Sequence, residues 1–275
     1  MVAWNWKAGG APTVDNSAGV GATPTAGSVK IDGSNLGSAL AGSIAATRLS
    51  ANTTSGFSIV LFTNNNTSGA TIAHGLSSAP EMVITKIKDA AYSWYTYHVG
   101  LDATAPEDYC VWLNHGTARS DNVQYWNDAA PSASVFTLGD EASNSLGGEP
   151  VIAYCFHSVE GYSKMGTYTG NGVADGGPFV YTGFRPRFAM VKRTNSTGGW
   201  PMWDIERPGY NLTNDVLYAS DSNAETTGAG TSSSVVDLVS NGFKIRGTSG
   251  NSGASGGTFI YYAVAQNPFK YANAR

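Results

Sequence analysis

The sequence predicts an all-β protein made of two tandem, duplicated β-sandwich domains of jelly-roll or lectin-like kind. Strand-length runs of β-branched and aromatic residues recur along the chain, bounded by Gly, Pro, Asn and Ser. Many of these runs also recur at a nearly fixed distance. We expect the domains at residues 56–160 and 161–275, preceded by an extended segment, residues 1–55, rich in Gly, Ala and Ser.

The repeat is long. Like residues stand 106 positions apart in three pairs: Pro80 and Pro186, Lys86 and Lys192, and Trp94 and Trp200. The offset grows to 107 between Phe136 and Phe243, and to 108 between residues 153–156 and 261–264, as loop insertions would produce. Solenoid units have only about 20–50 residues, so this period indicates two copies of a domain. Duplication favours a binding or structural module, because a catalytic site rarely survives as two copies with different residues.

The strands expected in each repeat are short. Residues 82–88, 188–193 and 258–264 are the clearest examples, and about eight such runs per repeat indicate a sandwich. Trp94 and Trp200 occupy matched positions, which predicts a role in core packing for both. Pro201 has no N–H and predicts a sheet edge or a bulge at its strand.

The N-terminal segment carries two candidate oligomer-interface sets. Residues 1–7 alternate like the closing strand 151–157, which predicts a strand that docks on a sheet edge of its own chain or of a neighbour, through Trp4 and Trp6. Leu36, Leu40 and Ile44 recur every four residues. They indicate either a short segment that packs against copies of itself or a linker with a few anchors, since two glycines weaken any helix there.

Composition excludes several classes of function. Only 13% of the residues are charged, the net charge is −4, and no cluster of Lys and Arg exists, so nucleic acid is not an expected partner. No apolar run is long enough for a membrane span, and we expect no secretory leader because no charged-then-apolar pattern opens the sequence. We expect no cofactor and no metal, because the four histidines and two cysteines lack ligand spacing. Cys110 and Cys155 are interpreted as buried small hydrophobes, with a disulfide as the alternative.

No catalytic residues are predicted. The acidic pairs Glu107–Asp108 and Asp140–Glu141 are adjacent in sequence, and Asp204 with Glu206 stands where a strand enters a loop. We interpret all three as solvated acidic residues rather than as a glycosidase dyad. Aromatic rings beside amides are typical of sugar binding. The candidate ligand-binding residues are therefore Trp112, Asn114, Gln124, Tyr125 and Trp126, with core or interface packing as the alternative.

A family resemblance rests on a series of motifs: Tyr-Thr-Gly-Asn-Gly from Tyr168, Gly-Phe-Arg-Pro from Gly183, Asn-Gly-Phe-Lys-Ile-Arg from Asn241 and Asn-Pro-Phe-Lys-Tyr from Asn267. With these motifs the chain resembles a tandem-repeat domain of unknown function found in tail-fibre-like virion proteins of marine bacteriophages, including cyanophages. The resemblance implies a structural or adhesive virion component and a homotrimer, and it brings no catalytic residues.

Three functions follow as hypotheses. The first is a non-enzymatic tail-fibre or appendage protein on the particle exterior, assembled in the host cytoplasm, that contacts the host surface and binds a glycan there. The second is a purely architectural virion component, such as a head decoration or tail connector. The third is a glycan-degrading tailspike enzyme, which requires two carboxylates about 5–10 Å apart in a cleft. The expected partners are further copies of the chain, other virion proteins and a host surface glycan.

Overall fold

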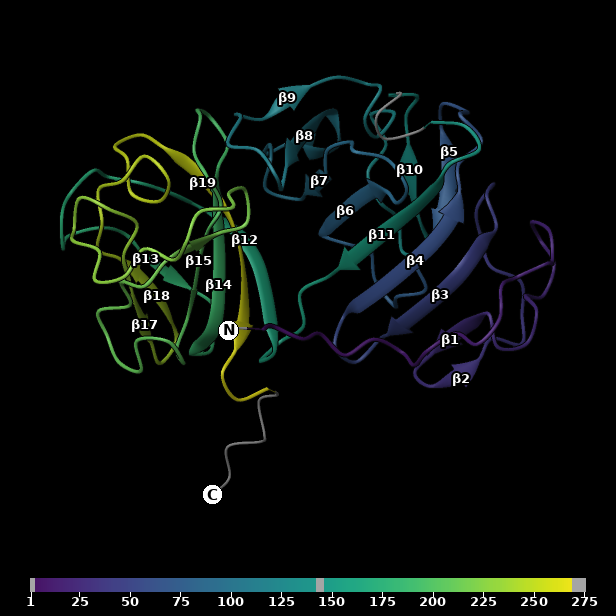
Figure 1. Cartoon of the computed structure of the whole chain (residues 1–275), viewed down its shortest axis with the longest axis horizontal. Coiled ribbons are helices and arrows are strands. Elements are labelled where there is room, and N and C mark those ends of the chain that lie inside the picture. The colour runs from purple at the N-terminus through teal and green to yellow at the C-terminus, as the bar shows by residue number, and fades with distance from the viewer. Residues whose placement is uncertain (1–2, 142–145, 269–275) are drawn as a thin grey trace. The chain divides into compact units, whose positions relative to one another are not determined.

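The computed structural model describes residues 3–141 and 146–268 (Figure 1). Met1 and Val2 of the predicted N-terminal strand, and residues 269–275 at the end of the predicted second domain, lie outside the described residues. The protein is all-β, as predicted. Within the described residues the one helical element is the 3-10 turn η1 (Pro106–Asp108). No helix in this part of the chain is long and apolar enough to cross a membrane.

The chain divides into two compact units. The first consists of residues 1–110 and 121–157, and the second of residues 111–120 and 158–275. The predicted boundary after residue 160 therefore lies close to the observed one. Residues 1–55, expected as a separate segment, belong to the first unit.

The first unit supplies two sheets, apart from residues 111–112 of β8 and residue 120 of β9, which are assigned to the second unit. The larger has the strand order β2-β1-β3-β4-β11-β6-β7-β8-β9, and the smaller pairs β10 with β5. Figure 1 shows β3, β4, β11 and β6 side by side. The strands are β1 (Val29–Ile31), β2 (Ser34–Asn35), β3 (Ala46–Asn52), β4 (Phe57–Thr63), β5 (Ala70–Ala73), β6 (Met82–Ile87), β7 (Tyr95–His98), β8 (Tyr109–Trp112), β9 (Ser120–Asp121), β10 (Val135–Leu138) and β11 (Pro150–Phe156).

Aromatic and aliphatic side chains of these strands form the core of the first unit. Phe62 of β4 and Phe136 of β10 are both buried, and their rings meet edge-to-face with centroids 6.2 Å apart. Because the two strands belong to different sheets, this contact joins the sheets face to face, as in a sandwich. In β11, Val151 lies opposite Phe62 of β4 on one side and Ile87 of β6 on the other.

The second unit also contains two sheets, with the orders β12-β19-β14-β15-β16 and β13-β18-β17. Its buried cluster joins them, since Val191 and Phe259 come from the first sheet and Val236 and Phe243 from the second. In β19, Phe259 lies opposite Tyr168 of β12 and Arg193 of β14. The strands are β12 (Ser163–Thr169), β13 (Phe179–Tyr181), β14 (Pro186–Arg193), β15 (Pro201–Asp204), β16 (Leu217–Tyr218), β17 (Val236–Val239), β18 (Gly242–Ile245) and β19 (Thr258–Ala265).

Pro201 illustrates how a proline is accommodated in a sheet. It was expected at a sheet edge or a bulge, but β15 lies between β14 and β16. The proline is the first residue of its strand. A strand-initial position tolerates the missing N–H, so the edge assignment was wrong while the strand itself is confirmed.

The N-terminal region differs most from expectation. Residues 3–8 form no strand, although Trp6 meets Phe156 of its own chain edge-to-face with centroids 6.3 Å apart. Residues 36–45 form no helix, and Ile44 is a buried anchor that bridges to Ile72. The region 29–52 instead supplies β1, β2 and β3 to the larger sheet of the first unit. The expected extended N-terminal segment is therefore not confirmed for residues 29–52.

Candidate functional site

Two of the predicted sugar-binding residues are buried. Trp126 is 2% exposed, donates its indole N–H to the carbonyl oxygen of Tyr109 at 3.1 Å, and packs edge-to-face on Tyr97. Tyr125 is also buried and lies against Tyr95, while Gln124 is exposed. A ring enclosed in this way offers no face for a sugar to stack on. For Tyr125 and Trp126 the alternative of core packing therefore describes the structure.

Trp112 and Asn114 lie in the second unit and are half-buried. The carbonyl oxygen of Trp112 accepts the indole N–H of Trp200 at 2.8 Å. The centroid of the Trp112 ring lies 6.4 Å from that of the His115 ring. Of the predicted aromatic residues, Trp112 is the one whose side chain retains accessible surface.

Residues 111–120 lie against β14 and the following loop, residues 194–200, and Lys192 of β14 bonds to them. The Lys192 ammonium donates to the carbonyl oxygens of Gly116 at 3.1 Å and Gly198 at 2.7 Å. A Cβ on Gly116 would lie 3.3 Å from the Gly198 oxygen, so the two backbones meet closely. Lys192 is fully buried, and burial lowers the pKa of this amine to about 8. Both of these hydrogen bonds go to backbone carbonyl oxygens, which is the pattern of a structural lysine.

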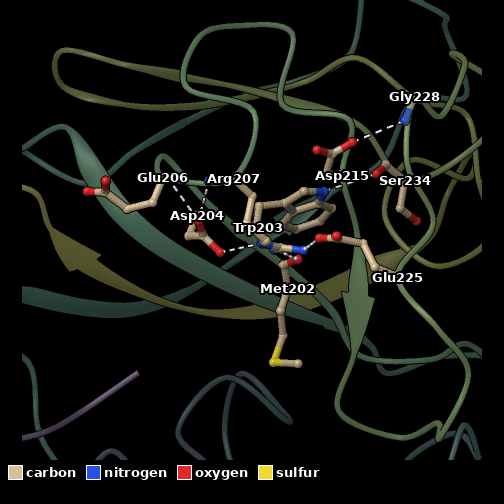
Figure 2. Close-up of polar contacts among 9 residues, drawn as sticks. All are labelled: Met202, Trp203, Asp204, Glu206, Arg207, Asp215, Glu225, Gly228 and Ser234. Atoms are coloured by element: carbon tan, nitrogen blue, oxygen red, sulfur yellow. Dashed lines mark hydrogen bonds and ion pairs between the residues drawn. The ribbon is translucent and has the colours of Figure 1, made fainter. Parts of the chain in front are cut away.

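Asp204, one member of the weighed acidic pair, belongs to a buried ion network (Figure 2). One carboxylate oxygen accepts the backbone N–H groups of Glu206 at 3.0 Å and Arg207 at 3.1 Å. The other accepts the Arg207 Nε at 2.6 Å, and the same guanidinium binds Glu225. Both carboxylate oxygens of Asp204 therefore accept hydrogen bonds. The interpretation of Asp204 as a solvated residue was wrong, since this carboxylate is buried.

Glu206 occupies a different environment from Asp204. It is exposed and pairs with Arg187 at 3.0 Å. Glu107 and Asp108 lie in η1, and Asp140 and Glu141 follow β10. In the ranges 3–141 and 146–268, no group of three or more His, Cys, Asp or Glu side chains is arranged to hold a metal ion.

His74 and His98 serve as backbone acceptors in the first unit. The Nδ1 of His74 accepts the Leu76 N–H at 3.2 Å, which leaves the Nε2 to donate to the Ser132 carbonyl oxygen at 3.1 Å. Burial lowers the pKa of His74 to about 4. His98 accepts the Gly100 N–H at 3.0 Å in the same way. Both imidazoles are buried, and these bonds assign them to the fold.

The two cysteines are free and buried, as predicted. Burial raises the pKa of the Cys110 thiol strongly and that of Cys155 to about 12. Thiols held in the neutral form are poor nucleophiles, so neither cysteine fits a catalytic role.

A cavity of about 500 Å³ lies in the first unit, against the outward sides of β3, β4 and β11. Its lining is mostly apolar, with Arg48 and Lys88 as its charged members. A sugar site requires amides and carboxylates for the hydroxyl groups, so the lining does not match that chemistry. The apolar side chains are those of Ala8, Ala11, Pro12, Leu49, Ile59, Leu61 and Ile152.

Exposed aromatic residues that the sequence analysis missed lie on β13 of the second unit. Phe179 is 48% exposed and Tyr181 is 59% exposed, while Val180 between them is buried. The Lys164 ammonium lies 5.2 Å from the centroid of the Tyr181 ring. Alternation of Phe-Val-Tyr marks a strand with one aromatic face, but nothing local in the sequence shows which face is covered.

Together these features define an all-β protein whose buried ionisable groups mostly bond to backbone or to one another. Residues 30–268 match a family described as a domain of unknown function (DUF7483), and the chain belongs to that family. Neither the curated proteins nor the solved structures include a match to the chain.

Proposed function

We propose that the two units arose by duplication of one β-sandwich, and that the protein is a non-enzymatic structural protein of a bacteriophage particle. In this proposal it forms part of a tail fibre or appendage that contacts the host surface. The observation that carries the proposal is a shared strand-pairing scheme in which the polar residues at matched places differ.

The pairing registers support duplication residue by residue. The strand β11 lies between β4 and β6 as β19 lies between β12 and β14. Phe62 and Ile87 face Val151, while Tyr168 and Arg193, each 106 positions later, face Phe259. Likewise Met82 faces His98, and Phe188 faces Asp204.

The polar residues at matched places support a non-enzymatic role. His98 in one unit and Asp204 in the other both accept the backbone N–H of the residue two positions on, at 3.0 Å. An imidazole in one unit and a carboxylate in the other thus accept the equivalent hydrogen bond in the same kind of turn. The turn is common to both units while the acid or base at its start differs, which is expected of a structural module.

The assignment to a phage particle rests on the family resemblance and on the neutral, Gly-rich composition. The proposed partners are other copies of the chain, other virion proteins and a host surface glycan. Trp112 and Asn114 are the proposed glycan contacts, because both are half-buried rather than enclosed. A head decoration or tail connector fits the same architecture without a ligand.

Electron microscopy of purified particles labelled with gold-conjugated antibodies against the protein tests this proposal. Labelling on tail appendages is the expected result, and labelling over the head would favour the decoration protein instead. Absence of the chain from purified particles would contradict both. Incubation with host envelope polysaccharide should release no reducing ends, and release in proportion to protein concentration would favour the tailspike enzyme.

A further inference from the structure

One continuous segment, residues 42–52, covers two strand edges in the first unit; we call it the edge segment. Its first part lies on β5, where the N–H groups of Ser43 and Ile44 donate to the Thr71 carbonyl oxygen at 2.9 and 3.1 Å. Its second part is β3, which pairs antiparallel with β4 so that Leu49 faces Val60. The first unit therefore leaves neither β4 nor β5 as an open edge.

The second unit lacks this cover. The strands β12 and β13 are the end strands of its two sheets, and the described residues place no strand on their outer sides. They hold the places of β4 and β5 in the pairing scheme. The cause is the order of the chain, because the residues just before β12 form β11, which lies inside the larger sheet of the first unit. Only residues 157–162 separate these two strands, which is too short a stretch for a second edge segment of the length of residues 42–52.

The direction of the free backbone groups on β12 follows from its hydrogen bonds. Gly170 donates to Gly257, on the β19 side. Ser163 instead exchanges bonds with Val159, and Met165 donates to the Ser158 hydroxyl at 3.0 Å. Because N–H directions alternate along an antiparallel strand, the N–H of Thr167 points away from β19. Residues 158–159 thus cover the start of this edge, and its later part is open for pairing.

The neighbouring edge strand β13 exposes Phe179 and Tyr181, as described above. An open strand edge beside exposed aromatic side chains is a template for an added strand. Main-chain hydrogen bonds would supply affinity, and contacts with the two rings would supply specificity.

We propose that the β12–β13 edge binds, by strand addition, an extended segment of another polypeptide with the chemistry of residues 42–52. That chemistry is a glycine where the segment crosses β13, followed by small and aliphatic residues that pair antiparallel with β12. Gly42 shows why glycine is required, since a Cβ there would lie 2.7 Å from the Thr71 oxygen and its φ is +103°. The inference depends on strand pairing and is independent of the particle that contains the protein.

The donor is a different polypeptide rather than a second copy. In its own first unit the edge segment is enclosed, with Ala46, Leu49 and Ala51 at most 1% exposed. A second copy could donate these residues only by removing a strand from its own sheet and exposing β4. A partner whose segment is unpaired before binding has no such penalty.

A synthetic peptide with the sequence of residues 42–52 tests the proposal. Labelled with a fluorophore and titrated into the full chain, it should give saturable anisotropy and slow the amide hydrogen exchange of Thr167. The variant Thr167→Pro removes the outward N–H, and proline is tolerated on an open edge. We expect at least a tenfold loss of peptide affinity for Thr167→Pro and no change for the control Thr167→Val, which keeps the N–H. A peptide with Gly42→Val should bind more weakly than the native sequence.

Tyr181→Ser is a second variant that leaves the strand backbone intact, and it should also weaken peptide binding. Circular dichroism melting establishes that each variant is folded. Absence of saturable binding, or equal binding by Thr167→Pro and Thr167→Val, would overturn the proposal. If light scattering finds an oligomer that Thr167→Pro converts to a monomer, the edge pairs with a second copy, and the proposed occupant is wrong.

Discussion

His98 and Asp204 are different residue types that have the same structural role. The sequence aligns them and suggests unrelated roles, a histidine and a carboxylate. In the structure each is buried at a strand end and accepts the backbone N–H two residues later. An imidazole nitrogen and a carboxylate oxygen can satisfy the same donor. The sequence could not reveal this equivalence, because it depends on the turn that follows each strand.

Asp204 is expected to stabilise the second unit strongly. Replacement by Ala removes the acceptor of two backbone N–H groups and one partner of the buried Arg207. Breaking a buried ion pair from one side costs about 3 kcal/mol or more. Urea denaturation should show this loss for Asp204→Ala. The control Glu206→Gln alters an exposed pair and should change stability by at most about 0.5 kcal/mol. Equal effects of the two substitutions would contradict this role of Asp204.

His74 should make the protein less stable in mild acid. Its folded-state pKa is about 4, below the ordinary value of 6.5, because burial disfavours the charged form. Between those values the unfolded chain binds a proton that the folded chain does not. Stability therefore falls as the pH falls from about 6.5 to 4, with no further loss from this group below pH 4.

The size of this effect follows from about 1.4 kcal/mol per pKa unit, which gives about 2 kcal/mol between pH 7 and pH 5. Urea denaturation of the native chain and of His74→Gln at both pH values isolates the contribution, since the glutamine does not titrate. An equal pH dependence in the two proteins would assign the acid sensitivity to other groups.

The thiols of Cys110 and Cys155 should resist alkylation in the folded protein. With a pKa near 12 for Cys155, and a higher one for Cys110, about one thiol in ten thousand or fewer is ionised at pH 8. Mass spectrometry after iodoacetamide treatment should find both cysteines unmodified without denaturant and both modified in guanidinium. Rapid native labelling, or a Cys110–Cys155 disulfide, would contradict their burial as free thiols.

At the scale of elements, the strands that the sequence predicts best are those with a dense local signal. Residues 82–88, 188–193 and 258–264 coincide with β6, β14 and β19, because β-branched and aromatic residues fill them and turn residues bound them. The strand β3 has no such signal in Ala-Thr-Arg-Leu-Ser-Ala-Asn. Its small residues form a strand because β4 lies beside them, and pairing with a distant segment is invisible to a local pattern.

The two tryptophans at matched positions, Trp94 and Trp200, are expected to contribute differently to the free energy of unfolding. Trp200 is 1% exposed and donates to the Trp112 carbonyl oxygen, whereas Trp94 is half-buried and stacks on Tyr154 with centroids 6.3 Å apart. Trp200→Phe leaves a cavity and an unsatisfied carbonyl, at a cost of about 2–4 kcal/mol. Trp94→Phe should cost about 1 kcal/mol, since water reaches the site. Thermal denaturation compares them, and a larger effect at Trp94 would contradict the assignment of Trp200 to the core.

At the scale of the whole molecule, the repeat offset anticipated two all-β units, but it could not anticipate their membership. Residues 111–120 belong to the second unit although they fall within the predicted first domain. Lys192 and Trp200 bind this segment through the carbonyl oxygens of Gly116 and Trp112. Backbone acceptors carry no sequence signature, so the contact could not be inferred from residue types.

The protein is expected to associate with copies of itself. The expected state is a homotrimer, held partly through Trp4 and Trp6, which are both half-buried. Each indole can bury on the order of 200 Å², and at about 25 cal/mol per Å² the pair would contribute several kcal/mol as an upper estimate. Trp6 already contacts Phe156 of its own chain, so a neighbouring subunit would cover what remains exposed.

Deletion of residues 1–55 is a poor test of this interface, because it removes β1, β2 and β3 from the first unit. The double substitution Trp4→Ser and Trp6→Ser leaves those strands in place. Light scattering should give a trimer mass for the intact chain and a smaller mass for the double variant at the same concentration. An unchanged trimer would locate the interface elsewhere, and a monomeric intact chain would contradict self-association altogether. The substitution is informative because both indoles precede the first strand, so the sheet of the first unit remains as the internal control.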